Sequence, residues 1–368
     1  MGFERIPIQR VTASAYVIPT DCPEADGTIT WTSTTMVLAE VTAGDGRGLG
    51  FSYADASAAA VIQRVLAKEI LGLDAMDTHA AWLAMIRSVR NMGRPGIAST
   101  AIAAMDTALW DLKAKLLGVS LARLLGPCRD RIALYGSGGF TSYSLEKLQE
   151  QLGTWSRQGL RAVKMKVGTE PTADAMRVSA ARGAIGSEVE LFVDANGAYT
   201  RKQALELAEA FAADHVTWFE EPVSSDDLEG LRLLRDRAPA AMRIAAGEYS
   251  YDVPYVRRML EAQAVDVQQV DATRCLGITG FMQAGALCAA HMIPMSAHTS
   301  PSIHVHPCCA LPAMLNLEYF HDHARLEHML FDGVLDPVDG SLAPAFDRPG
   351  LGLEFKRADA KRFAVQGG

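Results

Sequence analysis

Ionisable residues recur in this chain near the ends of short apolar runs, at intervals that suit one strand, one helix and two loops. Asp194 comes 28 residues after Lys166, and Glu220 comes 26 residues after Asp194. In a barrel of parallel strands, the carboxyl ends of the strands converge on one face, where active sites lie. We therefore expect a constellation for acid–base chemistry formed by Lys164, Lys166, Asp194, Glu220, Glu248, Asp271, His298 and Glu318.

Two lysines, Lys164 and Lys166, stand at alternate positions of the apolar run AVKMKVG. Side chains two residues apart on a strand point to the same side, so both ammonium groups can face the mouth of a barrel. A single lysine in such a run more often extends to solvent or pairs with a structural carboxylate. The series of ionisable residues that follows favours a functional interpretation.

Three carboxylates, those of Asp194, Glu220 and Glu248, follow three consecutive strands of the series. Brought together they would repel one another unless a cation held them, and an all-oxygen ligand set favours Mg²⁺ over zinc. Each one taken alone could instead cap the helix that follows its strand. Three in series favour a magnesium site, with the adjacent Glu221 in a supporting or structural role.

His298 and Asp271 follow two neighbouring strands of the series. A carboxylate that accepts a hydrogen bond from one imidazole nitrogen fixes the tautomer and leaves the other nitrogen free for proton transfer. An isolated histidine at a strand end is more often structural, and His304, His306, His321 and His323 have no evident role. The spacing from Asp271 singles out His298.

The elements that must position these residues are eight short apolar runs separated by helical stretches. Strands that alternate with helices indicate βαβ units and a parallel sheet, and eight of them predict an α/β fold of the TIM-barrel type. A doubly wound open sheet is the alternative, but no GxGxxG motif follows an early strand. The predicted strands are 132–137, 162–168, 191–197, 216–222, 243–248, 265–272, 292–298 and 316–319.

The pattern also predicts how the chain is divided. Residues 1–130 form an N-terminal α+β domain, with strands to about residue 52, helices to about residue 118, and a polar loop near 18–32. Residues 131–335 form the barrel. Residues 336–368 add no further βα unit and return to the first domain.

Composition excludes several classes of protein. A net charge of −8 and a pI of about 5.6 argue against a general nucleic-acid or anionic-membrane surface. The N-terminus lacks the apolar stretch of a signal peptide, and Gln283 and His291 interrupt the most apolar run. The six cysteines form no CxxC pair, so we expect reduced thiols, no zinc site and a cytoplasmic protein.

Taken in order, these motifs resemble those of the enolase superfamily, and within its mandelate racemase/muconate lactonizing enzyme family the mandelate racemase subgroup. The motifs are VKMKVG, VDANG, FEEP, AGE, QVDATR, SAH and LEY. The resemblance spans nearly the whole chain. It implies a capping domain, whose segment 18–32 is a lid, followed by a (β/α)7β barrel and a C-terminal return to the cap.

The resemblance also implies a role for each site residue. Mg²⁺ would be bound by Asp194, Glu220 and Glu248. Lys166 would be the base on one face of a small carboxylate substrate, and His298, oriented by Asp271, would act on the other face. Lys164 and a protonated Glu318 would contact the substrate carboxylate, and Asn196 a substrate hydroxyl. To act as a base Lys166 must be neutral, and we expect Lys164 and the metal to lower its pKa.

The family shares removal of the proton α to a carboxylate and diverges afterwards. Polar residues after His298 (Thr299, Ser300 and Ser302) and acidic residues in the lid (Asp21, Glu24 and Asp26) favour a polyol substrate. We therefore expect dehydration of an acid sugar to a 2-keto-3-deoxy acid, by a lyase that forms a homo-oligomer. The alternatives are a racemase, epimerase or cycloisomerase, a non-catalytic metal-binding barrel and, as a weaker rival, a metal-dependent hydrolase.

Overall fold

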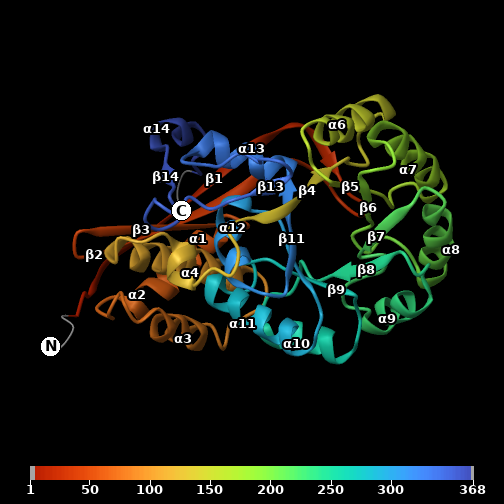
Figure 1. Ribbon diagram of the computed structural model, residues 1–368. Coiled ribbons are helices and arrows are strands. Elements are labelled where there is room, and N and C mark those ends of the chain that lie inside the picture. The colour runs from red at the N-terminus through yellow and green to blue at the C-terminus, as the bar shows by residue number, and fades with distance from the viewer. Residues whose placement is uncertain (1–4, 366–368) are drawn as a thin grey trace.

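The computed structural model describes residues 5–365, which form an antiparallel sheet with helices followed by a closed parallel barrel (Figure 1). The first sheet has the order β1-β2-β3 and contains β1 (Ile8–Ala25), β2 (Thr30–Ala43) and β3 (Gly46–Tyr53). Its strands pair with their sequence neighbours, as the TAGDGRG turn signal between β2 and β3 predicts.

The segment 18–32 was predicted to be a loop. In the structure it is mostly the paired end of the β1–β2 hairpin. Pairing continues to Glu24 opposite Trp31 and Ala25 opposite Thr30, after a register shift that begins at Pro19. Pro19 is tolerated because β1 is an edge strand. The hairpin crosses from the first sheet to the barrel (Figure 1). Its turn is anchored there, because the hydroxyls of Thr141 and Thr169 both donate to the carbonyl of Asp26.

Gly27 lets the hairpin turn sit directly on the barrel. A Cβ at this position would lie 2.4 Å from the carbonyl oxygen of Ala195 and 2.7 Å from that of Val167. These residues directly follow β6 and β5. The turn is therefore packed against the end of the barrel at which these two strands finish.

The helices of the first domain cover one face of its sheet. The longest, α4, packs closely on β3 because Gly48 and Gly50 have no side chain to hold it away. A Cβ at Gly48 would lie 2.1 Å from the carbonyl oxygen of Ala108. These helical elements are α1 (Ser57–Val61), the π-helix η1 (Ile62–Leu66), α2 (Ala67–Ile70), α3 (Thr78–Ser88), α4 (Ile97–Leu116) and α5 (Leu121–Leu125).

The barrel confirms the predicted (β/α)7β architecture. Eight parallel strands run in sequence order, and the last pairs with the first to close the sheet. The strands are β4 (Ile132–Gly138), β5 (Ala162–Lys166), β6 (Glu190–Asp194), β7 (Val216–Glu220), β8 (Arg243–Ala246), β9 (Val267–Val270), β10 (Met295–Ala297) and β11 (Met314–Phe320). The connecting helices are α6 (Leu145–Arg157), α7 (Pro171–Ile185), α8 (Arg201–Ala212), α9 (Leu228–Arg237), α10 (Val253–Glu261), α11 (Gly277–Ala290) and α12 (Pro301–Ala310).

Alternation along the barrel strands separates two cores and places the lysines. On β5, Val163 and Met165 pack with the side chains of the surrounding helices. The opposite face of the sheet is filled by Tyr135, Ala162, Phe192, Trp218, Ala245 and Val267. Lys164 and Lys166 share that inner face, and the Lys164 ammonium lies 5.3 Å from the centre of the Tyr135 ring.

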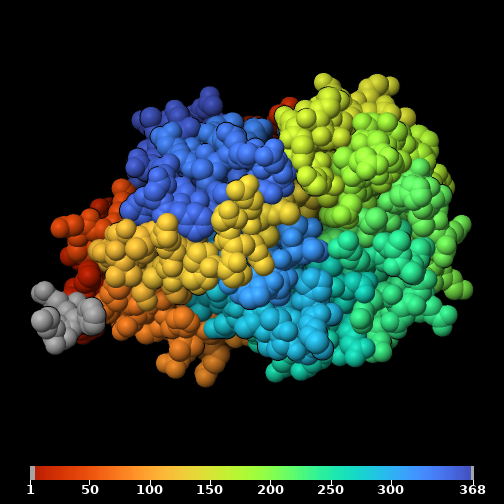
Figure 2. Space-filling view, in the orientation of Figure 1, coloured from red at the N-terminus to blue at the C-terminus, as the bar shows by residue number. Residues whose placement is uncertain are grey.

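The chain after β11 lies against both preceding parts. In this segment β12 (Phe331–Asp332) pairs with β14 (Glu354–Phe355). The short strand β13 (Ser341–Leu342) pairs with β4 of the barrel. Near the end, Ala364 forms a bridge with Tyr16 of β1, and in Figure 2 the C-terminal residues border the first domain. The remaining elements are α13 (His321–Leu330), α14 (Arg357–Ala360) and η2 (Lys361–Phe363). The domain boundaries at residues 130 and 335 stay a prediction.

Across residues 5–365, no helix combines the length and the apolar composition that a membrane crossing needs.

Candidate active site

The ionisable residues predicted to converge lie at the carboxyl ends of the barrel strands. Lys166, Asp194 and Glu220 end three adjacent strands in matching register, with Lys166 opposite Asp194 and Asp194 opposite Glu220. The others follow or end the remaining strands: Glu248 after β8, Asp271 after β9, His298 after β10, and Glu318 within β11. Parallel pairing with little register shift therefore brings them to one end of the barrel.

Asp194, Glu220 and Glu248 form a compact group of buried carboxylates. Each offers an oxygen atom within 4.8 Å of those of the other two, and their exposed fractions are 0%, 0% and 4%. Such a set of convergent anionic oxygens fits Mg²⁺, which prefers oxygen ligands and keeps some of its waters. The protein therefore has a donor set that could hold this ion.

The two lysines occupy the same group of carboxylates. Lys164 donates to Glu220 and contacts Glu318 at 2.9 Å, and Lys166 Nζ lies 2.5 Å from Asp194 Oδ2. Burial lowers the pKa of Lys166, but the charges of Asp194, Glu248 and Glu220 together outweigh burial, and the pKa is raised. Of the two expected causes of a lower Lys166 pKa, the charge of Lys164 does lower the pKa, and the effect expected of the metal stays a prediction.

Asn196 completes the surroundings of Lys166. Its Oδ1 accepts a hydrogen bond of 3.0 Å from Lys166 Nζ, and its backbone N–H donates to Asp194. Its backbone has a φ of +47°, a conformation that asparagine tolerates better than most residues. The side chain is therefore held between the lysine and the carboxylates.

His298 and Asp271 form the predicted pair. His298 Nδ1 lies 2.9 Å from Asp271 Oδ2, and the other carboxylate oxygen accepts from the backbone and the hydroxyl of Thr273. Burial raises the pKa of Asp271, but the His298 hydrogen bond and charge outweigh it and lower the pKa. Nε2 of His298 faces the carboxylate group, 3.5 Å from Glu248 Oε2. The imidazole is thus oriented by an anionic carboxylate.

The partners of Glu318 in this structure are an ammonium group and an N–H donor, and the protonated form that the resemblance implies for substrate binding stays a prediction. Its Oε1 lies 2.9 Å from Lys164 Nζ, and its Oε2 accepts from the Thr299 backbone N–H at 3.1 Å. Burial raises its pKa, but the charges of Lys164 and His298 outweigh burial and hold the pKa at about 2. In this structure both oxygens of Glu318 are therefore placed as acceptors.

A cavity of about 190 Å³ lies beside these groups and is lined by residues of both the barrel and the hairpin. Its wall contains several residues that the sequence analysis did not assign. Arg274 binds Glu248 through an ion pair of 3.1 Å, and His323 stacks on Tyr53. The residues lining the cavity are Asp26, Ile29, Trp31, Thr34, Lys166, Asn196, Glu248, Tyr249, Arg274, His298, Thr299, Glu318, Phe320 and His323.

A signal for some of these residues is present in the sequence. Arg274 lies three residues after Asp271 in the QVDATR motif, so its place near the mouth of the barrel could have been inferred. Of the polar residues after His298 only Thr299 lines the cavity, while the backbone N–H of Ser302 donates to Glu327. The lid contributes Trp31 and Ile29 as well as Asp26, so the wall is more apolar than was predicted.

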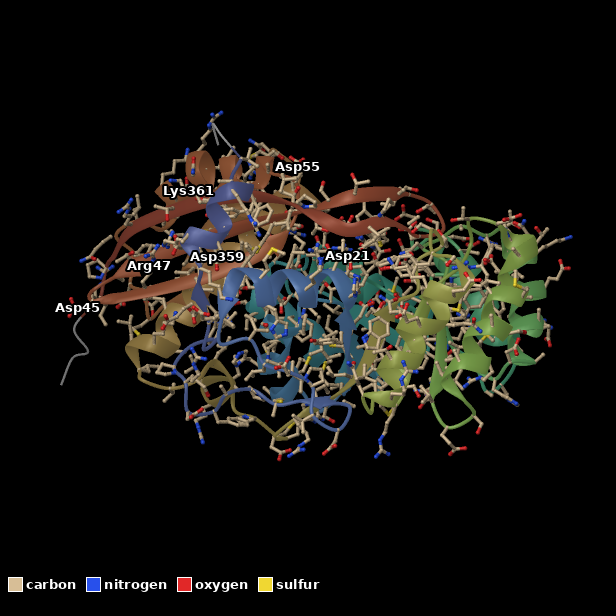
Figure 3. The ribbon with its side chains drawn as sticks, turned by 90° about the horizontal axis from the view of Figure 1, so that it is seen from above. Asp21, Asp45, Arg47, Asp55, Asp359 and Lys361 are labelled. Carbon is tan, nitrogen blue, oxygen red and sulfur yellow. The ribbon has the colours of Figure 1, made fainter. Side chains whose placement is uncertain are left out.

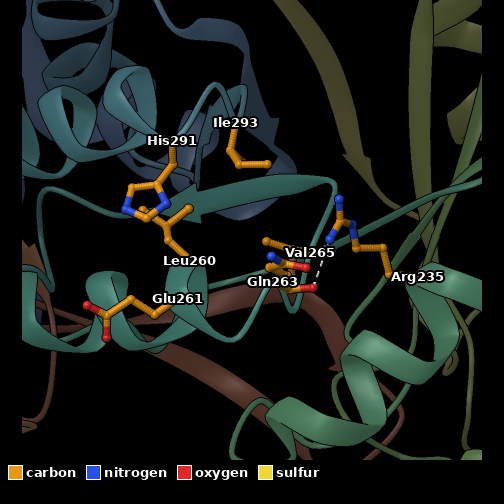
Figure 4. A pocket seen from close by; sticks show the side chains of 7 residues that line it. All are labelled: Arg235, Leu260, Glu261, Gln263, Val265, His291 and Ile293. Atoms are coloured by element: carbon orange, nitrogen blue, oxygen red, sulfur yellow. Dashed lines mark hydrogen bonds between the residues drawn. The ribbon is translucent and has the colours of Figure 1, made fainter.

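A larger hollow of about 310 Å³ lies elsewhere on the barrel (Figure 4). It is bordered by Val265, which precedes β9, and by Ile293, which precedes β10, so it lies at the amino ends of the strands. Arg235 there donates to the carbonyl of Gln263 and to Asp266. These contacts of Arg235 join the loops that precede the strands, which is a structural role. Chemistry in such barrels occurs at the opposite face.

The fold and the site define a class: a capped (β/α)7β barrel with an acidic site at the carboxyl ends of its strands. A family model described as the mandelate racemase/muconate lactonizing enzyme N-terminal domain matches residues 12–126. A model described as the enolase C-terminal domain-like family matches residues 147–360. The chain therefore belongs to the mandelate racemase/muconate lactonizing enzyme family of the enolase superfamily.

Individual relatives agree with this assignment. L-talarate/galactarate dehydratase of Salmonella typhimurium is 32% identical over 358 residues, which cover 94% of this chain and 88% of the relative. A mandelate racemase/muconate lactonizing enzyme-like protein from Rubrobacter xylanophilus is 53% identical with a TM-score of 0.96, covering 98% of this chain and all of its own. A racemase from Streptomyces coelicolor with bound magnesium is 29% identical with a TM-score of 0.92, covering 97% and 100%.

Further curated relatives are named as sugar-acid dehydratases and as cycloisomerases. The protein is accordingly an enzyme, a lyase or an isomerase.

Proposed function

We propose that this enzyme removes the proton α to the carboxylate of an acid sugar and then eliminates the β-hydroxyl as water, which yields a 2-keto-3-deoxy acid. The observation that carries the proposal is the placement of Lys166 and His298. Both line one cavity, and each flanks the carboxylate group, Lys166 beside Asp194 and His298 beside Glu248. Two side chains that can carry a proton, placed on two sides of the proposed metal-binding carboxylates, suit chemistry on both faces of a substrate carbon.

Asp194, Glu220 and Glu248 would hold Mg²⁺. When bound, the ion supplies positive charge that stabilises the negative charge developing on the substrate carboxylate. Lys164 adds to that charge from the chain itself. Its pKa is raised despite burial, because Glu220 and Glu318 lie beside it, so it stays a cation. In this proposal Lys164 binds the substrate carboxylate and orients it.

Lys166 would take the α-proton on its Nζ. It first has to lose its own proton and its close pairing with Asp194, so the carboxylate must find another positive partner when the site is loaded. Asn196, which accepts from Lys166 in this structure, would then be available to a substrate hydroxyl. These changes need only side-chain movements within one buried group.

His298 would deliver a proton from Nε2 to the departing β-hydroxyl. Asp271, as an ionised carboxylate 2.9 Å from Nδ1, keeps the ring oriented and stabilises its cationic form. Glu318 would contact the substrate carboxylate together with Lys164. Since Glu318 is ionised in this structure, donating a hydrogen bond to the substrate would require it to take up a proton as the substrate binds.

Dehydration is favoured by the curated dehydratase relatives and by a solved talarate dehydratase from a Polaromonas strain, which is complexed with magnesium and L-glucarate. The second candidate is cycloisomerisation or racemisation. It is supported by a relative named D-galactarolactone cycloisomerase, and by the same lysine and histidine pair, which could return a proton to the opposite face. The homo-oligomer and the cytoplasmic location stay predictions.

Proton NMR of the magnesium-loaded enzyme in D₂O, with a panel of aldonic, aldaric and simple 2-hydroxy acids, tests the proposal. Loss of the α-proton signal together with new 3-deoxy signals supports dehydration and identifies the substrate. Exchange or inversion at the α-carbon without elimination would instead establish the isomerase. A panel without any exchange would contradict acid-sugar chemistry at this site.

A further inference from the structure

We propose a second divalent-cation site, separate from the barrel carboxylates, formed by Asp21, Glu24 and His321. Two of these residues lie on β1 of the hairpin, and the third begins α13 directly after β11. One carboxylate oxygen of Asp21, one of Glu24 and one ring nitrogen of His321 all lie within 4.8 Å of one another. Figure 3 labels Asp21, which belongs to the hairpin and lies next to the blue C-terminal part of the chain in that view.

The strongest observation is the state of the Glu24 carboxylate. The residue is fully buried, with an exposed fraction of 0%. Its Oε2 accepts a hydrogen bond of 2.8 Å from the indole N–H of Trp31, whereas its Oε1 is buried with no hydrogen-bond partner in residues 5–365. A buried polar oxygen without a partner is costly. A cation at this point would supply the missing partner.

Within residues 5–365, no lysine or arginine forms an ion pair with Asp21 or Glu24. A further buried carboxylate, that of Asp322, follows His321, and its charge is taken up by Arg325. Lys147 lies 2.8 Å from the sulfur of Cys22. In the described part of the chain, the basic group that pairs with Asp21 is His321, at 2.9 Å. Glu24 forms no ion pair within the described chain.

The donor set indicates the kind of cation. Two carboxylates and one imidazole suit a transition-series ion such as Mn²⁺ or Zn²⁺, whereas the barrel carboxylates offer oxygen only. The side chains of Asp21 and His321 are 43% and 25% exposed, so an ion can enter from solvent and keep water as its other ligands. Asp21 Oδ2 and His321 Nε2 lie 2.9 Å apart in this structure, so a bound ion would replace their hydrogen bond.

Such a site would tie the hairpin to the barrel next to the cavity. Glu24 holds Trp31, a residue of the cavity wall, and His321 comes three residues after Glu318 on the same chain segment. A cation bound between them would fix the position of the cavity wall that the hairpin supplies. We expect it to affect substrate binding, and therefore KM, more than the chemical step.

Pulsed EPR of bound Mn²⁺, with stoichiometry from equilibrium dialysis, tests the site. We expect two Mn²⁺ per chain, one of which shows coupling to an imidazole nitrogen. In both His321→Gln and Glu24→Gln the nitrogen-coupled equivalent should be lost, while the other equivalent remains. Asp55→Asn, a substitution in the first domain away from the cluster, is the matched control and should retain both.

Glu248→Gln separates this site from the barrel carboxylates. In that variant the nitrogen-coupled Mn²⁺ should remain while the other equivalent is lost. The proposal is overturned if wild-type protein shows no nitrogen coupling, or if His321→Gln keeps it. Neither result depends on turnover, so the outcome is independent of the proposed dehydration.

Discussion

The ammonium nitrogen of Lys166 lies 2.5 Å from Oδ2 of Asp194, a carboxylate that we assign to magnesium. Lys164 approaches the same oxygen at 3.4 Å. The proposed base and the proposed metal ligand are thus partners in this structure, and the close pair raises the pKa of Lys166. A base must be neutral, so in this proposal magnesium binding and activation of Lys166 would be coupled through Asp194.

This coupling makes Asp194 a residue whose loss should affect the metal first. In Asp194→Asn one of three anionic ligands becomes a neutral amide of similar size. Since even partners outside the ligand shell typically change metal affinity by about 10–100-fold, we expect a loss on the order of 100-fold or more. Isothermal titration with Mg²⁺ measures it. Asp236→Asn, at an exposed residue of α9, should leave the affinity unchanged, and an unaltered affinity in Asp194→Asn would remove this residue from the site.

His298 should be needed for elimination but not for the first proton transfer. In His298→Asn the magnesium ligands and Lys166 remain, so the α-proton should still exchange with D₂O. Formation of the 2-keto-3-deoxy acid should fall by roughly 10²–10⁴-fold, the usual contribution of a general acid. Proton NMR follows both events in one sample, with His291→Asn at an exposed residue as the control. Equal loss of exchange and of product would instead make His298 the base.

A buried carboxyl between the two domains should make stability depend on pH. Burial raises the pKa of Asp106 to about 7, although Thr279 donates to both of its oxygens. The folded state therefore holds this proton more tightly than the unfolded state does. The resulting stabilisation is complete below about pH 4 and is lost as the pH rises through about 7, by up to about 1.4 kcal/mol per pH unit.

Urea unfolding at about pH 5 and about pH 8 measures this effect. Asp106→Asn cannot ionise, so its free energy of unfolding should fall less than that of the wild type between the two conditions. Asp45→Asn, at the exposed turn between β2 and β3, should behave as the wild type does. If the free energy of unfolding of Asp106→Asn and of the wild type fell equally between the two pH values, this carboxyl would not titrate in that range.

Much of the fold could be predicted because its signals are local. Each barrel strand is a short apolar run with a polar residue at its end, and parallel strands in sequence order place those ends together. The positions of Lys166, Asp194 and His298 follow from this rule alone. Their chemical roles rest on the resemblance and on the proposals above.

The remaining features depend on contacts between distant segments. Pro19 and its polar neighbours are typical of a loop, yet pairing with β2 makes most of the segment a strand. The ionisation of Lys166 and Glu318 depends on which atoms meet, Asp194 in one case and Lys164 in the other. Spacing along the chain gives the neighbourhood of a side chain but not its partner.

The most direct test of the account is the α-proton exchange of the Lys166→Met variant in D₂O with magnesium and the best substrate of the panel. Methionine has a similar length and no basic nitrogen, so exchange and turnover should be abolished while Mg²⁺ still binds. Lys202→Met, an exposed lysine of α8, is the control and should exchange at the wild-type rate. Exchange at the wild-type rate in Lys166→Met would contradict the assignment of Lys166 as the base.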